Sequence, residues 1–399
     1  MVPSEVFLVM RLLIQAAAVS VTALAAGEHR AIAQVVQPRP ATEVRLSEES
    51  FPSIGLLEGA DEYLFAGING GALLADGSVV VSDRAHFRIQ RFGPDGTHLW
   101  SRGREGEGPG EFEYVQVASG CASAERIVVY DIWTARVSVF SGGGELLDDY
   151  PFLFNGLPLR RFSCAPNGRL GFAGSSVRMG ETGAEPGDII RELLSLGSAE
   201  LGDTVAATLR ERIPSSEMRY LGPGDAMPGS IWSHDAVFAA ADQGMWFGTS
   251  EDYEVELVGW TGETIRRIRW EGPDLNVTRE DIDRYRDALE DSYRRGGGAD
   301  WRARFQSRWE WESEIVPDVF PAYQGLMMGD DGVLWVHDYI RPGERSEWFA
   351  FDSDGTWTRT LVLPSRTVLL DIGPDWAVVR TRDEVDVQRV AVHALVENQ

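Results

Sequence analysis

An all-β fold made of a repeated four-stranded unit is the fold class that the sequence predicts. Three observations predict it. A two-residue turn followed by a β-rich run recurs along the chain, a second turn follows at a nearly fixed spacing, and β-branched and aromatic residues dominate the runs between turns. With 399 residues, 43% of them hydrophobic, the chain is long enough for a large packed core.

The recurring unit is defined by turns whose second residues are Gly77, Glu125, Gly168, Gly244, Gly332 and Asp375. The runs that follow read SVVVSD, RIVVYD, RLGFAG, MWFGTS, VLWVHD and WAVVRT. The short intervals between turns, 48 and 43 residues, match a four-stranded propeller blade of about 40–50 residues. The sequence therefore predicts a six-bladed β-propeller of four-stranded antiparallel blades within residues 42–399.

The second turn gives the strand order inside each unit. Gly96 lies 19 residues after Gly77, and Gly144 lies 19 residues after Glu125, so both turns mark a hairpin between the third and fourth strands. The last unit ends after its third strand. We expect Thr42–Leu46 to supply the missing strand and close the ring, because an unpaired strand edge invites aggregation. A frayed N-terminal tail is the alternative.

Two insertions lengthen the units. Residues 274–320 carry helical signals: Thr278 and Asp281 resemble a capping box, and an apolar stripe predicts a helix over Arg279–Arg295. A second helix places Trp301, Phe305 and Trp309 at spacings of four. This helical insertion between blades 4 and 5 either covers blade edges or acts as a lid. The earlier insertion, 175–233, predicts elongated strands and a long loop.

The first unit resembles an NHL repeat. That pattern has Asp after the second strand, Arg-Ile in the third, an Asp-Gly turn and a closing G-x-G-P-G-x-F; the matching residues are Asp83, Arg88, Ile89, Gly96, Gly108, Pro109, Gly110 and Phe112. The second unit keeps Asp131, Arg136 and Val137. The whole arrangement is similar to secreted bacterial six-bladed propeller proteins that generally lack an assigned activity. The resemblance therefore implies a fold and no particular function.

The Asp and Arg residues that recur in the first two units could form an acid–base set. The pairs are Asp83–Arg88 and Asp131–Arg136, and both occupy the same position in their unit. Repetition of this kind is typical of a structural salt bridge between the second and third strands. We therefore predict two structural ion pairs.

The N-terminus is predicted to be a signal peptide, residues 1–33. The apolar run Leu12–Ala26 is too short for a bilayer span and is followed by two possible cleavage sites, Ala23-Leu24-Ala25 and Ala31-Ile32-Ala33. The chain is thus expected to be exported to the periplasm or the extracellular space, with no membrane span after signal cleavage. A mis-assigned start codon and an uncleaved anchor are the alternatives.

Composition excludes several functions. All 37 basic residues are arginine, so Schiff-base chemistry, a pyridoxal anchor and a P-loop lysine are absent. The net charge of −25 argues against nucleic acid and anionic membrane as partners, since both require a positive surface. The expected partner is a small molecule or an extracytoplasmic protein, and the chain is expected to be a monomer.

No local metal motif or nucleophile motif is present. The six histidines show no H-x-x-x-H or H-E-x-x-H spacing, and no G-x-S-x-G occurs. A propeller can still collect ligands around its axis, but only His234 lies at a predicted inner-strand start, and Glu58 with Asn69 makes an incomplete calcium set. We therefore expect no cofactor, with Ca or Zn in the central channel as the alternative.

The candidate site consists of residues at or beside the starts of the predicted inner strands, which should surround the channel mouth. They are Asn69, Gln116, Arg161, Trp232, His234, Asp235, Tyr323 and Gln324. The pattern favours a ligand- or protein-binding module over catalysis, and it identifies no catalytic residue. The alternative functions are a metal-dependent lactonase, hydrolase or lyase of propeller architecture, and a structural module of a cell-envelope complex.

The two cysteines occupy equivalent positions in neighbouring units. Cys121-Ala122 precedes Arg126-Ile127, and Cys164-Ala165 precedes Arg169-Leu170. In an oxidising compartment this symmetry favours a disulfide between Cys121 and Cys164. Two buried thiols that serve as small core residues are the alternative.

Overall fold

The computed structural model describes residues 36–40, 42–117, 120–175, 185, 188–203, 206–222, 225–228, 231–314, 316–341 and 344–397. These belong to one compact unit, Val36–Gln399. The predicted signal peptide and its cleavage sites lie outside the described residues. Within the described part of the chain, no helix is long and apolar enough to cross a membrane.

The described strands form five sheets. Four of them are small and antiparallel, apart from one parallel strand added at the edge of the fourth. The first contains β3 (Ile68–Leu73), β4 (Val79–Asp83), β5 (Arg88–Phe92) and β6 (His98–Arg102). The second contains β7 (Val115–Gln116), β8 (Arg126–Asp131), β9 (Arg136–Ser141) and β10 (Leu146–Pro151). The third contains β11 (Leu159–Cys164), β12 (Arg169–Ser175), β13 (Ile189–Glu200), β14 (Ala207–Gly222) and β15 (Asp225–Pro228).

The fourth sheet contains β16 (Val237–Ala241), β17 (Gly244–Gly248), β18 (Glu254–Gly259) and β19 (Thr264–Trp270), with β1 (Val36–Gln37) at its edge. The fifth has eight strands and contains β20 (Tyr323–Met328), β21 (Leu334–Asp338), β22 (Ser346–Phe351), β23 (Trp357–Leu363), β24 (Thr367–Ile372), β25 (Trp376–Arg382), β26 (Gln388–Glu397) and β2 (Glu43–Ile54). Short 3-10 helices cover Asp61–Tyr63 and Arg84–His86.

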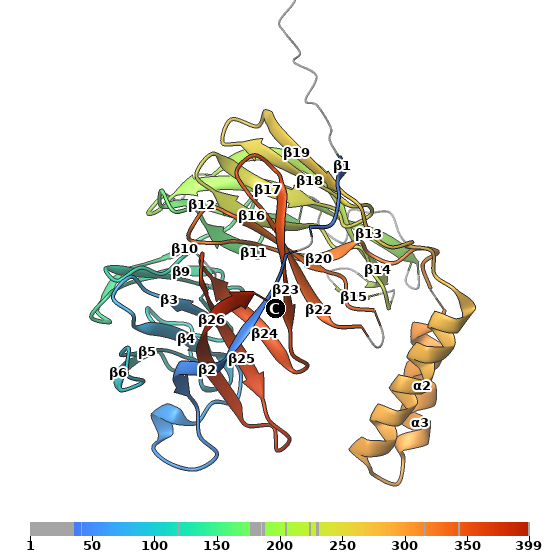
Figure 1. Cartoon of the computed structure of the whole chain (residues 1–399), viewed down its shortest axis with the longest axis horizontal. Helices are drawn as coiled ribbons and strands as arrows, with labels where there is room; N and C mark the ends of the chain where they lie inside the picture. The colour runs from blue at the N-terminus through green and yellow to red at the C-terminus, as the bar shows by residue number, and fades with distance from the viewer. Residues whose placement is uncertain are drawn as a thin grey trace, which may run out of the picture. The chain divides into compact units, whose positions relative to one another are not determined.

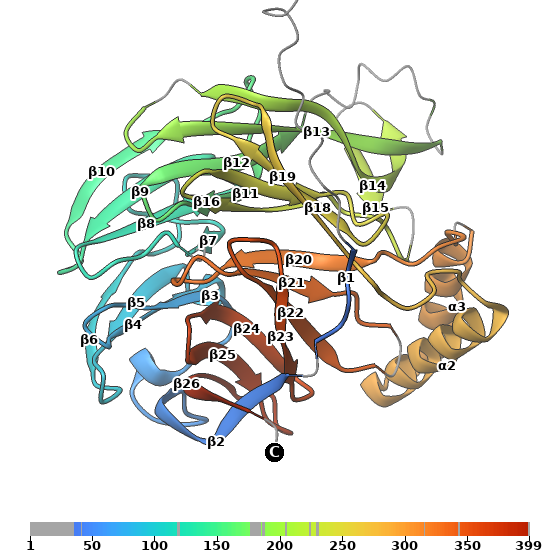
Figure 2. The same ribbon diagram turned by 45° about the horizontal axis from the view of Figure 1, so that its top comes forward.

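The sheets follow one another in chain order around a common axis, which is the arrangement of a β-propeller (Figures 1 and 2). Inner strands of successive sheets pack together: β11 lies against β16, β16 against β20, and β24 of the last sheet against β3 of the first. Large apolar side chains fill the spaces between neighbouring sheets, as with Phe112 and Phe140 between the first two sheets. The fold is therefore all-β, with the predicted helices as its main addition.

The turns that defined the repeat are the tight turns of the structure. Gly77 lies between β3 and β4 with φ 81°, and Gly96 lies between β5 and β6 with φ 80°. A side chain is strained at such angles, which explains why glycine stands at both positions. The same turns hold the ladder in register, with Leu73 opposite Val79 and Phe92 opposite His98.

The N-terminal segment differs from the prediction in extent. The predicted closing strand ended at Leu46, whereas β2 continues to Ile54 and pairs antiparallel with β26 across two irregularities. On its other side β2 pairs in parallel with β23, from Glu43 opposite Thr360. A second N-terminal strand, β1, pairs in parallel with β19. Strand β1 could not be predicted, because two residues are too few to show an alternating pattern.

The helical insertion forms α2 (Arg279–Gly296) and α3 (Trp301–Glu312), which lie side by side (Figure 2). Thr278 and Asp281 make the capping box that begins α2. The ring of Tyr285 on α2 contacts Trp232, which lies in the segment before β16, and the Tyr285 hydroxyl donates to Glu312 of α3. The first contact joins the insertion to the rest of the chain, and the second joins the two helices.

Two buried carboxylates at the ends of β4 and β8 serve the backbone. Asp131 accepts hydrogen bonds from the amides of Glu113 and Tyr114, each at 2.7 Å, and from the amides of Trp133 and Thr134. It does not form the predicted pair with Arg136, whose guanidinium binds Asp149 on β10 instead.

Asp83 has the equivalent position in the first sheet. It accepts from the amide of Gly67 at 2.8 Å, contacts His86, and lies 3.7 Å from Arg88. Its ion pair with Arg88 is therefore loose, and the backbone contact is the close one. Each carboxylate thus links the segment before the first strand of its sheet to the turn after the second strand.

A disulfide joins the second and third sheets. It links Cys121 to Cys164, with Cα atoms 4.9 Å apart. Cys164 ends β11, while Cys121 lies in the connection between β7 and β8. Both are buried in the core cluster that these two sheets share.

Candidate functional site

A cavity of about 320 Å³ lies where the inner strands of the sheets converge. Its lining includes residues of β3, β7, β11, β16, β20 and β24, so it occupies the axis of the propeller. Three predicted site residues line it: Asn69, Gln116 and Arg161. The structure thus brings these three residues together at one cavity, and their role in binding stays a prediction.

A second cavity of about 310 Å³ adjoins the first. The two share Gln116, Arg160, Arg161 and Phe162. The remaining lining consists mainly of aromatic side chains, namely Tyr114, Tyr130 and Trp133, together with Ile132. The axial cavity therefore opens, between the second and third sheets, into an aromatic pocket with two arginines at the junction.

The charge of this double cavity opposes that of the protein. No acidic residue lines either cavity in the described part of the chain, although the net charge is −25. Arg160 pairs with Glu192 at 3.0 Å, and Arg161 lies 3.7 Å from Asp235, with both side chains nearly half exposed. The guanidinium of Arg161 is thus loosely held and faces solvent.

Other arginines extend this positive region. Arg84 donates to the hydroxyl of Tyr114 at 2.9 Å and lies over its ring. Burial, with Arg382 and Arg84 nearby, lowers the pKa of Arg380 from its usual value. The side chain of Arg380 donates to the carbonyl of Ile68, at the start of β3. An anion at the channel mouth would therefore meet a positive potential.

Amides complete the lining. Asn69 donates to the carbonyl of Val115 and accepts from the hydroxyl of Ser82, so its side chain ties the first two sheets together. Gln116 is exposed, and its amide lies at 3.4 Å from the carbonyl of Asn69, which is a weak contact. Gln116 therefore has donor and acceptor capacity left for a ligand.

Tyr323 and Gln324 were wrongly predicted to face the channel. Tyr323 is 1% exposed, and its hydroxyl donates to the carbonyl of Glu254 on the neighbouring sheet. Gln324 donates to His337 and to the carbonyl of Asp338. The reason is geometric: the faces of an inner strand pack against adjacent sheets, so a large side chain at its start can point into a core instead of the channel.

Trp232 and His234 are also displaced from the predicted site. Trp232 is 2% exposed and packs on Phe320 and Tyr285, beneath the helical insertion. His234 is 5% exposed, and burial lowers its pKa, so its ring is neutral at pH 7. Of the predicted residues in this segment, only Asp235 lies near the channel mouth, where its carboxylate is 3.7 Å from the guanidinium of Arg161.

The described residues around the channel do not match the set of ligands that the alternative calcium or zinc ion would require. No group of three His, Cys, Asp or Glu side chains able to hold a metal ion occurs among the described residues. Glu58 is exposed and lies outside the cavity lining, and Asn69 uses its amide within the protein. Among the described residues, the channel lining therefore shows no ready donor set for calcium or zinc.

Sequence reasoning missed three residues of this site: Arg160, Tyr114 and Trp133. A signal for the first was available, since Arg160 and Arg161 stand together at the start of a predicted inner strand. The aromatic pair lies in connections before and within the second sheet, where ring centroids of Tyr114 and Trp133 are 5.6 Å apart. Their meeting depends on the fold and has no sequence pattern.

No protein-family model matches the chain, and no curated protein matches its sequence. Among solved structures it is similar to a member of the DUF4221 family from Bacteroides vulgatus, with TM-score 0.50 and 11% identity over 90% of this chain and 99% of that one. A protein of Bacteroides fragilis proposed to be exported gives 0.47 and 12% over 90% and 99%. The calcium-binding protein regucalcin from Agrobacterium tumefaciens gives 0.42 and 13% over 90% and 97%. At such identities the likeness concerns the fold alone.

Proposed function

We propose that the protein is an exported, six-bladed propeller that binds a small anionic molecule with a planar or apolar body at its channel mouth. The observation that carries this proposal is the double cavity with Arg160 and Arg161 at its junction and, among the described residues, no acidic side chain in its lining. The arginines suit a carboxylate, phosphate or sulfate group. The rings of Tyr114, Tyr130 and Trp133 suit the body of the ligand.

The six-blade count rests on how the eight-stranded sheet is packed. Its strands β20–β23 and β24–β26 are two successive antiparallel runs, joined by the parallel pairing of β2 with β23. A hydrophobic cluster lies between the two runs, with Trp348 and Leu361 from one and Leu369 and Val379 from the other. This packing supports two blades, the second of which β2 completes.

Export is supported by two features. The N-terminal apolar run has the length of a signal-peptide core, and the disulfide between Cys121 and Cys164 is stable in an oxidising compartment. Expression of the full chain in a bacterium followed by N-terminal sequencing of the extracytoplasmic protein tests this. A mature terminus after Ala25 or Ala33 supports export. Recovery of uncleaved protein in the cytoplasm contradicts it.

The binding proposal is tested by calorimetry with 4-hydroxycinnamate and its neutral amide. We expect the acid to bind and the amide to bind at least tenfold more weakly, because only the acid pairs with the arginines. Arg161→Gln should weaken binding of the acid about tenfold, which corresponds to about 1.4 kcal/mol of binding free energy. Arg286→Gln, an exposed arginine of α2, is the matched control and should change nothing.

Two results would contradict the proposal. Equal binding of acid and amide would remove the role of the arginines, and binding that survives Arg161→Gln unchanged would place the ligand elsewhere. The enzyme alternatives receive no support from the channel lining, because the described residues there provide neither a carboxylate set for a metal nor a histidine.

A further inference from the structure

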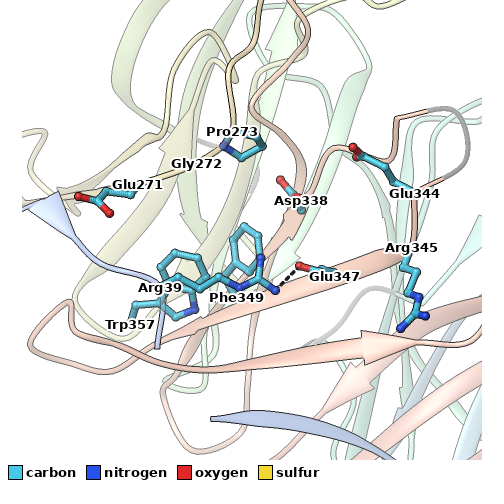
Figure 3. A pocket seen from close by; sticks show the side chains of 10 residues that line it. All are labelled: Arg39, Glu271, Gly272, Pro273, Asp338, Glu344, Arg345, Glu347, Phe349 and Trp357. Atoms are coloured by element: carbon cyan, nitrogen blue, oxygen red, sulfur yellow. Dashed lines mark hydrogen bonds and ion pairs between the residues drawn. The ribbon is translucent and has the colours of Figure 1, made fainter. Parts of the chain in front are cut away.

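A larger cavity, of about 510 Å³, lies away from the axis, between β19 and the β20–β23 run. We call it the outer groove. Its charged lining residues are Glu271, Asp338, Glu344, Glu347, Arg39 and Arg345. Phe349 and Trp357 form its floor, and Pro273 stands on the side of the fourth sheet (Figure 3). The outer groove is therefore acidic with an aromatic floor, the opposite of the channel mouth.

Asp338 of the outer groove occupies the same repeat position as Asp83 and Asp131. Each ends the second strand of its run, and each stands opposite the first residue of the inner strand: Ile68 for Asp83, Val115 for Asp131 and Tyr323 for Asp338. The first two are fully buried and serve the backbone. Asp338 is only partly buried, and it faces the cavity.

The residue that stands opposite this carboxylate on the third strand also differs between the sheets. In the first two sheets the partners of these carboxylates in the ladder are Arg88 and Arg136. In the β20–β23 run the ladder pairs His337 with Trp348, so the next residues, Asp338 and Glu347, face each other. An acid–acid pair thus replaces an acid–base pair beside an open cavity. Acidic side chains that line one cavity create a negative potential, which favours a cation.

A cation of the chain itself already lies there. The guanidinium of Arg39 donates to Glu347 at 2.7 Å and lies 6.0 Å from the ring centre of Phe349. Figure 3 shows its side chain stretched along the floor formed by Phe349 and Trp357. Arg39 follows the two-residue strand β1, and its side chain is 48% exposed. A half-exposed arginine that follows a short N-terminal strand can be displaced by a competing ligand.

We propose that the outer groove is a second binding site, specific for a guanidinium or ammonium group on a short apolar chain, and that Arg39 is its intramolecular occupant. The ring floor supplies cation–π contact, and Glu347 supplies the charged hydrogen bond. Glu271 and Glu344 line the same cavity, and a cation bound there would favour the ionised form of Asp338. The site is separate from the channel mouth and does not depend on the function proposed for it.

The test measures binding of arginine methyl ester by calorimetry, with the neutral citrulline methyl ester as the matched ligand. Arg39→Ala should raise the affinity for arginine methyl ester at least tenfold, because a tethered competitor is removed. Glu347→Gln in the same background should lower it about tenfold. Arg45→Ala is the control: Arg45 is an exposed arginine of β2 outside the groove, and its loss should leave binding unchanged.

The peptide Gly-Arg-Gly distinguishes a small ligand from a protein side chain. Stronger binding of the peptide than of the ester identifies an arginine of a polypeptide as the natural ligand, and equal binding identifies a small cation. Failure of the folded Arg39→Ala protein to bind either probe at millimolar concentration overturns the proposal. Equal binding of the citrulline ester also overturns it, since the charge would then be irrelevant. Binding of 4-hydroxycinnamate reports on the channel mouth independently.

Discussion

The second sheet and the β20–β23 run contain the same residue at the same repeat position and surround it differently. Asp131 is closed off from solvent and accepts four backbone amides from the connections around β7 and β8. Asp338 lies beside a cavity, next to Glu347 and Glu344. The repeat fixes where the carboxylate stands, and its neighbours decide whether it holds the backbone or remains available to a ligand.

The largest expected difference between the two positions comes from one substitution made at both. Asp131→Asn places an amide NH₂ against backbone donors and should destabilise the fold by about 3–5 kcal/mol. Asp338→Asn should cost less than about 1 kcal/mol, because few donors depend on that carboxylate. Urea unfolding of both variants measures the difference. Equal losses would show that the two carboxylates have the same structural role.

Removing the disulfide tests whether the region around Asp131 is the more strongly fixed one. The bond closes a separation of 43 residues, and the double variant Cys121→Ser/Cys164→Ser should lose about 4 kcal/mol in urea unfolding. No such bond crosses the outer groove, since the chain has two cysteines. Thiol titration of the denatured, unreduced wild-type protein should find no reactive thiol. Two reactive thiols per chain would refute the bridge.

The pH dependence of stability separates Asp338 from its repeat equivalents. Burial first, then the carboxylates of Glu347 and Glu344, raise the pKa of Asp338 from 3.8 to about 7, against smaller opposing effects of Arg341 and the amide of Tyr339. The folded state thus holds this proton more tightly than the unfolded state. Its contribution to stability is complete below pH 4 and is lost as the pH rises through 7.

Asp338→Asn should remove the loss of stability that accompanies ionisation of Asp338. From pH 5 to pH 8, the free energy of unfolding of the wild-type protein should therefore fall relative to that of the variant. Arg39, Arg345 and Glu271 line the same cavity and are present in both proteins, so the comparison isolates the effect of Asp338. Urea midpoints of both proteins at the two pH values measure the effect. Parallel profiles would contradict it.

The smallest expected change is that of Arg39→Ala on stability. Its ion pair with Glu347 is partly exposed, and such pairs contribute about 0–1 kcal/mol. The melting temperature should therefore move by no more than a few degrees, while cation binding in the outer groove changes at least tenfold. A large loss of stability would make Arg39 a structural residue of the groove.

Much of the fold could be predicted from sequence because its turns are local. Gly77 and Gly96 mark hairpins whose left-handed backbone requires glycine, and the alternating runs between such turns give the strands. The extent of β2 and the parallel pairing of β1 could not be predicted. Both depend on strands more than 200 residues away in the sequence, and two or three backbone bonds leave no pattern in the side chains.

The candidate site was only partly predictable. Asn69, Gln116 and Arg161, chosen by repeat position, line one cavity at the propeller axis. The same reasoning failed for Tyr323 and His234, because position along a strand does not determine which neighbouring surface covers the side chain. The outer groove had no sequence signal, since it forms where Arg39 meets residues some 300 positions later.

The ionisation of Asp338 is the property that most directly distinguishes the two repeat positions. Carbon-13 NMR of aspartate-labelled protein measures it, and the spectrum of Asp338→Asn assigns the signal. We expect its carboxyl to titrate near pH 7, as burial and the facing glutamates require, and its pKa to fall when arginine methyl ester saturates the Arg39→Ala protein. A carboxyl that titrates near pH 4, with no change on addition of the ester, would contradict the claim that the repeat position is structural in one sheet and ligand-facing in another.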